Sequence, residues 1–121
     1  MNRYAIAVAA AVAAIAWLAS GPAFGHAFLK SATPAVGSTA ASPPAEVRIS
    51  FTEDVEASFS KIAVQDGAGG DVTSGKVRAV SGDTLAVGLK KLLPGSYKVT
   101  WHATSVDAHR TQGKFTFSVK Q

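Results

Sequence analysis

The stretch Tyr97-Lys98-Val99-Thr100-Trp101-His102-Ala103 alternates apolar and polar side chains at every position. In a β-strand, successive side chains point to opposite faces, so a period of two is typical of a strand with one buried and one solvated face. The stretch therefore predicts such a strand. Trp101 is the expected core anchor, and His102 is expected to point outward.

The same period recurs on both sides of this strand. Further strands are predicted around Val47 to Phe51, Ile62 to Val64, Val77 to Val80, Leu85 to Leu89 and Phe115 to Val119. The Gly-rich segment from Gly67 to Gly75 reads as a hairpin or loop, and Pro94-Gly95 as a tight turn. Six or seven short strands predict an all-β, antiparallel, two-sheet Greek-key sandwich with an immunoglobulin-like architecture. The expected core aromatic residues are Phe51, Phe59, Tyr97, Trp101, Phe115 and Phe117.

The first 25 residues have a different character from the rest of the chain. Arg3 is followed by 16 apolar or nearly apolar residues, and Ala23-Phe24-Gly25 offers small residues at the −3 and −1 positions of a cleavage site. This pattern predicts a secretory signal peptide over 1–25 and a mature domain over 26–121. A membrane anchor is the alternative, although the run is shorter than the roughly 18 residues that a span needs. Cleavage after Ala23 or after Ala27 is also open.

The composition excludes several classes of function. The chain of 121 residues has no Cys, and its one Met is the initiator, so disulfides, thiolate metal sites, blue-copper centres and Met-rich Cu(I) sites are excluded. The net charge of +4 falls to +3 when Arg3 is removed, and Lys90-Lys91 is the only adjacent basic pair. Nucleic-acid binding proteins usually show a clustered basic face, so we expect no nucleic-acid partner.

Two short segments carry candidate metal ligands. Cleavage after Gly25 makes His26 the first residue, whose free amine and ring Nδ1 can then chelate one ion. Asp107-Ala108-His109 places a carboxylate and an imidazole two residues apart, on the same side of an extended segment. Arg110 is an alternative salt-bridge partner for Asp107. A donor set of two imidazoles, an amine and a carboxylate suits Cu(II) in a tetragonal site, and it also suits tetrahedral Zn(II).

The mature chain resembles the CopC family of periplasmic copper-binding proteins over nearly its whole length. The residues that carry the resemblance are His26 to Pro34, Ile49 to Glu53, Phe59 to Ile62, Leu93 to Trp101, Ser105 to His109 and Gly113 to Phe117. The resemblance implies a Greek-key β-sandwich, often described as cupredoxin-like. It also implies a Cu(II) site formed by His26, Asp107 and His109, with Glu53 as a weak or outer ligand. Some family members carry a second, Met-rich Cu(I) site, but the region from Gly67 to Gly82 has neither Met nor His, so one Cu(II) per chain is expected.

The expected function is that of a monomeric, non-catalytic, periplasmic protein for copper homeostasis or resistance. Such a protein would sequester copper or deliver it to a partner, such as an inner-membrane copper transport protein, and its mature form would have no membrane span. Two other classes are weighed against this. A histidine-brace copper monooxygenase needs an open coordination position, which a third ligand at Asp107 would fill. A metal-free immunoglobulin-like interaction module would bind no stoichiometric copper.

Overall fold

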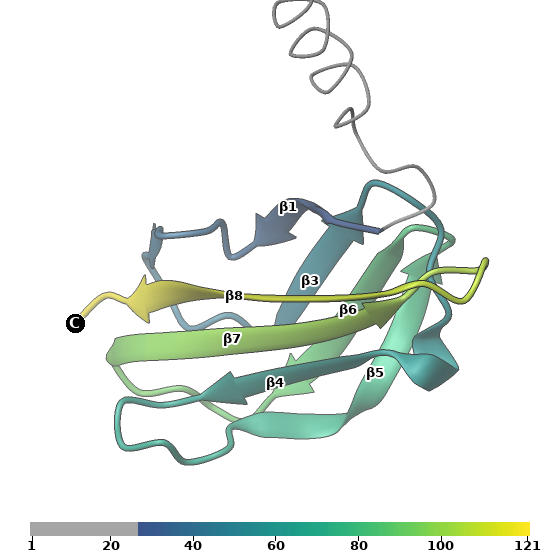
Figure 1. Ribbon diagram of the computed structural model, residues 1–121. Coiled ribbons are helices and arrows are strands. Elements are labelled where there is room, and N and C mark those ends of the chain that lie inside the picture. The colour runs from purple at the N-terminus through teal and green to yellow at the C-terminus, as the bar shows by residue number, and fades with distance from the viewer. Residues whose placement is uncertain (1–26) are drawn as a thin grey trace, which may run out of the picture.

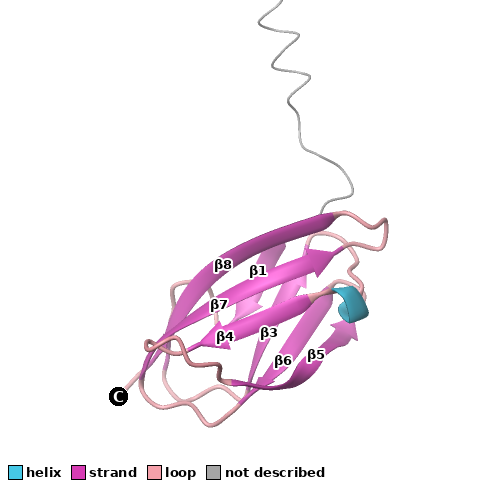
Figure 2. Ribbon diagram, turned by 60° about the horizontal axis from the view of Figure 1, so that its bottom comes forward, coloured by secondary structure: helices cyan, strands magenta, loops and turns pink. Residues whose placement is uncertain are grey.

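The computed structural model describes residues 27–121, which form a sandwich of two four-stranded sheets (Figure 1). One sheet has the strand order β1-β3-β6-β5 and the other β2-β8-β7-β4. All pairs are antiparallel except the short parallel pair of β2 and β8. Figure 2 shows the two layers and the single helical turn at one end. The predicted all-β sandwich is confirmed; the predicted signal peptide over 1–25 lies outside the described residues and stays a prediction.

The strands follow the period-two segments, with two short additions near the start, and β5 begins at Thr73, inside the segment predicted as a hairpin or loop. The first sheet consists of β1 (Leu29–Thr33), β3 (Glu46–Phe51), β5 (Thr73–Ser81) and β6 (Thr84–Leu89). The second sheet consists of β2 (Thr39–Ala40), β4 (Lys61–Gln65), β7 (Gly95–Thr104) and β8 (Arg110–Val119), and the 3₁₀ turn η1 (Ala57–Phe59) precedes β4. The hairpin of β7 and β8 is the longest pairing and runs from Gly95 opposite Val119 to Thr104 opposite Arg110.

The core lies between the two sheets and is closed by aromatic contacts. Trp101 on β7 meets Phe51 on β3 edge to face, with ring centroids 5.2 Å apart, which joins the two sheets. Tyr97 stacks on Phe117 within the second sheet at 5.4 Å. His102 is exposed between the buried Trp101 and Ala103, as the alternation predicts.

Phe59 was expected in the core, and this expectation was wrong. Its side chain is 70% exposed. Ile62 on β4 points inward, so Ser60, two residues earlier, also points inward, and Phe59 falls on the solvent side. The buried Ser60 hydroxyl accepts a hydrogen bond from the Thr104 N–H at 3.1 Å and donates one to the Glu56 carbonyl at 2.7 Å. A polar residue therefore occupies the buried position that hydrophobicity alone assigns to Phe59.

Gly113 gives a direct test of the packing between β7 and β8. It is paired with Trp101, and a Cβ added at Gly113 would lie 2.6 Å from an atom of the indole ring. We expect Gly113→Ala to lower the free energy of unfolding by about 1–3 kcal/mol, because the indole must move in a packed core. Gly67→Ala is the control, since no atom lies within 4 Å of its added Cβ. Equal denaturant midpoints for the two variants would contradict this packing.

Candidate metal centre

The segment that joins β7 to β8 is a tight turn, and the expectation of an extended segment was wrong. The Ser105 N–H donates to the His109 carbonyl at 2.9 Å, and the Ala108 N–H donates to the Ser105 carbonyl at 2.9 Å. Ala108 adopts a φ of 70°, a left-handed conformation that non-glycine residues seldom adopt outside turns. The turn still brings Asp107 and His109 together, through a reversal of the chain rather than through the pleat of a strand.

The Asp107 carboxylate and the His109 imidazole are in contact. Nδ1 of His109 lies 3.2 Å from Oδ1 of Asp107, and both side chains are about half exposed. Two donors that each lie about 2 Å from one metal ion, at a right angle, are separated by about 3 Å. The pair therefore already has the spacing of adjacent ligands of one ion. Arg110, the alternative partner, forms no ion pair with Asp107.

Ser105, which no pattern in the sequence indicates, holds this pair in place. Its side chain is buried, its hydroxyl donates to the Asp107 carboxylate, and the same oxygen accepts the His109 N–H at 3.2 Å. The hydrogen bond from Ser105, followed by the one from His109, keeps the pKa of Asp107 below its ordinary value. Asp107 is therefore an anion at neutral pH with one oxygen already oriented.

The start of the described chain is fixed beside this turn. Ala27 is fully buried, and its carbonyl accepts a hydrogen bond from the hydroxyl of Thr111, two residues after His109 on β8. The Phe28 N–H donates to the Thr52 hydroxyl at 3.0 Å, and the Thr52 N–H donates back to the Phe28 carbonyl at 2.8 Å. The backbone just before β1 thus lies between the end of β3 and the start of β8, at the end of the sandwich where the β7–β8 turn lies (Figure 1).

The other candidate ligands do not join Asp107 and His109 within the described residues. His26 lies outside the described residues, so its role stays a prediction. Glu53 is exposed in the turn after β3, next to Thr52, and forms no ion pair within residues 27–121. His102 lies on the outer face of β7, opposite Lys61 and Gln112. No group of three His, Cys, Asp or Glu side chains able to hold a metal occurs in that range.

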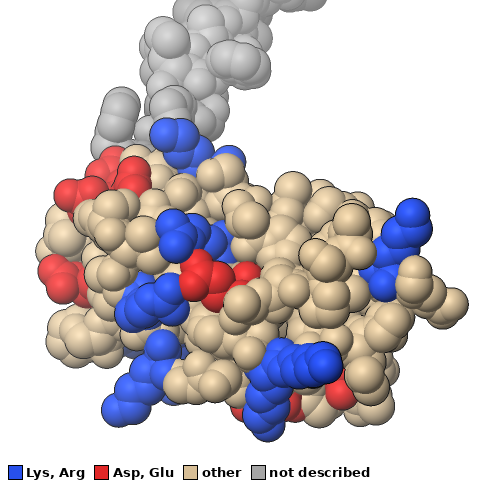
Figure 3. All heavy atoms as spheres, turned by 180° about the vertical axis from the view of Figure 1, so that it is seen from behind, with Lys and Arg blue, Asp and Glu red and all other residues tan. Residues whose placement is uncertain are grey.

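Negative charge gathers at the same end of the molecule. Figure 3 shows acidic side chains grouped where the described chain begins. Glu53 and Asp54 follow β3 there, and the Asp54 carbonyl accepts the Val106 N–H at 3.1 Å, which ties the two loops together. A negatively charged environment favours the approach of a cation.

The described part of the chain, residues 27–121, has no helix with the length and apolar character of a membrane span.

Comparison with known proteins gives a consistent set of relatives. The CopC domain family matches residues 29–120. Protein YobA of Escherichia coli K12 is 35% identical over 98 residues, which are 78% of this chain and 79% of YobA. Copper resistance protein C of Pseudomonas syringae pv. tomato is 35% identical over 111 residues, which are 85% of this chain and 87% of that protein. The crystal structure of CopC from Methylosinus trichosporium OB3b superposes with a TM-score of 0.71 at 32% identity, covering 78% of this chain and 94% of that one.

Ser105→Ala tests whether the hydroxyl sets the state of Asp107. Losing its hydrogen bond removes the main stabilisation of the carboxylate, so the pKa of Asp107 should rise toward its ordinary value of about 3.9. A carbon-detected NMR titration of the side-chain carboxyls measures this. Thr73→Val is the control: it removes a hydroxyl bond to Asp71, whose pKa is lowered first by the Thr73 backbone N–H and then by that hydroxyl, and it should leave the titration of Asp107 unchanged. An unchanged Asp107 titration in Ser105→Ala would contradict the assignment.

Proposed function

The chain belongs to the CopC family, and on that premise we propose that it is a non-catalytic periplasmic protein that binds one Cu(II) ion for copper homeostasis or resistance. His26, Asp107 and His109 hold the ion. The protein sequesters copper or passes it to a partner, for which an inner-membrane copper transport protein is the expected kind.

The observation that carries the proposal is the contact between Asp107 and His109, beside the fixed backbone of Ala27 and Phe28. The two side chains have the 3.2 Å spacing of adjacent ligands. The Ala27 carbonyl accepts a hydrogen bond from Thr111, and residue 26 precedes Ala27 by one peptide step, about 3.8 Å between Cα atoms. The proposal therefore requires His26 to reach only from its peptide bond with Ala27 to the Asp107–His109 pair for its amine and ring nitrogen to complete the site.

The donor chemistry favours divalent copper. An amine, two imidazoles and one carboxylate give four nitrogen and oxygen donors, the number that a tetragonal Cu(II) site uses, and copper heads the affinity order for such ligands. The mature chain from residue 26 contains no Cys and no Met, so soft ligands for Cu(I) are missing from its sequence. Copper is here the cargo of the protein, and its release is part of the function.

The proposed export and the proposed site depend on each other. Residue 26 gains a free α-amine only when the peptide bond after Gly25 is cleaved, and the predicted signal peptide over 1–25 provides that step. A chain that still carries its first 25 residues would lack this donor. The site would therefore be assembled only after the protein has crossed the membrane.

Copper titration of the mature protein tests the ligand set. We expect one Cu(II) per chain with an axial, nitrogen-rich electron paramagnetic resonance signal. His26→Ala and His109→Ala should each weaken binding by about a hundredfold or more, since each removes a direct ligand. His102→Ala is the matched control and should bind as the parent does, because His102 lies on the outer face of β7. Binding that is the same in all three variants would overturn the proposal.

Acid should release the metal in a defined range. The imidazoles and the amine must lose their protons to bind copper. The pKa of Asp107 is held below its ordinary value, so this carboxylate stays ionised while the nitrogen donors become protonated. Copper should therefore be lost between about pH 6 and 4 in equilibrium titrations. Affinity that stays flat over this range and falls only below pH 4 would point to a carboxylate site instead.

A further inference from the structure

Two grooves meet at Lys61, at the start of β4. The first has a volume of about 440 Å³ and lies on the outer face of the β2-β8-β7-β4 sheet, lined among others by Phe59, Lys61, His102, Arg110 and Gln112. The second, of about 480 Å³, lies along the edge of β4 and includes Lys61, Ile62 and Lys76. We call the area formed by Phe59, Lys61, Lys76, His102, Arg110 and Gln112 the Phe59 surface.

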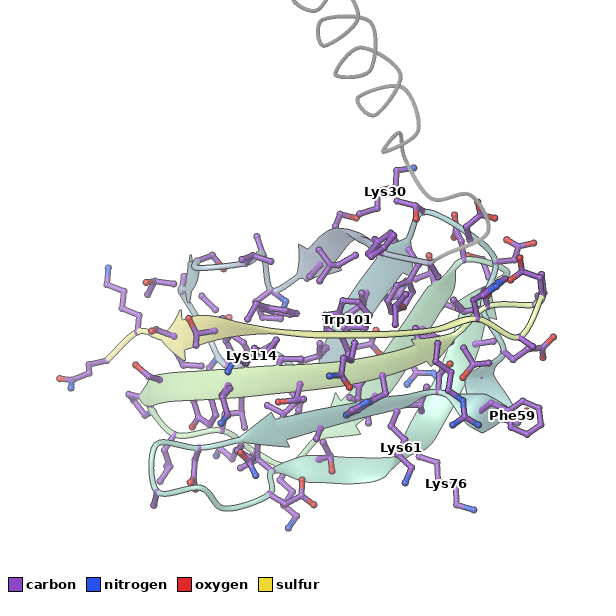
Figure 4. All side chains as sticks on the ribbon, in the orientation of Figure 1. Lys30, Phe59, Lys61, Lys76, Trp101 and Lys114 are labelled. Carbon is purple, nitrogen blue, oxygen red and sulfur yellow. The ribbon has the colours of Figure 1, made fainter. Side chains whose placement is uncertain are left out.

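An exposed aromatic ring is held rigidly at one end of this surface. Phe59 is 70% exposed, and Figure 4 shows it pointing away from the sandwich. Its backbone is fixed, because the Phe59 N–H donates to the Glu56 carbonyl at 3.1 Å and the Thr104 hydroxyl donates to the Phe59 carbonyl at 2.9 Å. Aromatic and Arg side chains presented on a fixed backbone are typical of the residues that dominate protein–protein binding energy.

The charge of the Phe59 surface is uncompensated. Lys61, Lys76 and Arg110 line the two grooves, none of the lining residues is acidic, and none of the three cations pairs with an acidic side chain of residues 27–121. The opposite sheet differs. There Glu46 binds both Arg48 and Arg78, and Figure 3 shows acidic and basic side chains mixed on that face.

The edge of β4 indicates that the partner of the Phe59 surface is an extended chain and not a flat surface. β4 is the last strand of its sheet, so one side of its backbone is not covered by a neighbouring strand of that sheet. The Val72 N–H covers the far part of this edge by donating to the Val64 carbonyl at 2.9 Å, whereas the part at Ile62 lines the second groove. Lys61 and Lys76 lie beside it (Figure 4).

We propose that the Phe59 surface is a docking site for an acidic, extended segment of a partner protein, with an apolar side chain of that segment resting on Phe59. Carboxylates of the segment face Lys61, Lys76 and Arg110, and its backbone lies along the edge of β4. Concave grooves beside an edge strand fit a peptide better than they fit the plane of a lipid bilayer. The inference goes beyond the proposed function and needs no bound metal. Arg110 directly follows His109, so an occupant of this surface lies next to the candidate metal centre.

The test uses the metal-free mature protein and short synthetic peptides in an NMR titration of backbone amides. The probe peptide alternates Glu with Val and Phe; one comparison peptide has Gln for every Glu, and another has Ser for Phe. We expect the probe to shift the amide resonances of η1, β4 and the start of β8, and to bind at least about tenfold more tightly than the Gln peptide. Its affinity should fall in about 0.5 M salt, which screens the charges. The Ser peptide should bind more weakly than the probe.

Charge-reversal variants locate the binding. Lys61→Glu and Arg110→Glu should each weaken binding of the probe peptide by about tenfold. Lys91→Glu, which makes the same charge change outside both grooves, should leave this binding unchanged. Thermal unfolding of each variant checks that it folds. If only one of Lys61→Glu and Arg110→Glu folds, that variant alone is enough for the test. The proposal is overturned if the probe does not bind at about 1 mM, if the Gln peptide binds equally well, or if Lys91→Glu weakens binding as much. It is also overturned if only vesicles containing phosphatidylglycerol bind in a Lys61-dependent way.

Discussion

The attachment of the chain at Ala27 and Phe28 is the constraint on which the candidate metal centre depends. Backbone bonds to Thr52 and a side-chain bond from Thr111 fix this short segment between β3 and β8. Without it, Asp107 and His109 would be a half-exposed pair on a hairpin turn, with too few donors for a tight site. With it, the proposed cleavage after Gly25 would place the two nitrogen donors of His26 one residue away from a fixed segment. The entropic cost of ordering Ala27 and Phe28 is thereby met during folding.

The fold was largely predictable from the sequence because period two is a strong signal in a sandwich. The alternation around Trp101 predicted the buried face of β7 and the exposure of His102. The error at Phe59 shows where this signal fails. Ser60 occupies the inward position because its hydroxyl is hydrogen-bonded to Thr104 and Glu56. A prediction from hydrophobicity assigns the aromatic residue to the core instead. Hydrogen-bond partners that are 44 residues apart in sequence cannot be read from a local pattern.

The candidate site was predictable in part. Asp107 and His109 were identified as neighbours, but by the wrong geometry, because a left-handed residue at Ala108 between two strands leaves no mark in a sequence without Gly or Asn at that position. Ser105 was missed because a serine two residues before an aspartate is common, and its role arises only when the turn buries it. The acidic group where the described chain begins and the basic residues around Phe59 also emerge only in three dimensions.

The most direct measurement compares Cu(II) binding by two forms of the protein that differ in one residue: the chain starting at His26 and the same chain with Gly25 retained before it. Competitive titration gives the affinities, and electron paramagnetic resonance gives the nitrogen ligation. If the free amine of His26 is a ligand, retaining Gly25 turns that amine into an amide, weakens binding by about a hundredfold or more and changes the nitrogen couplings. Equal affinities and superimposable spectra would contradict the central claim.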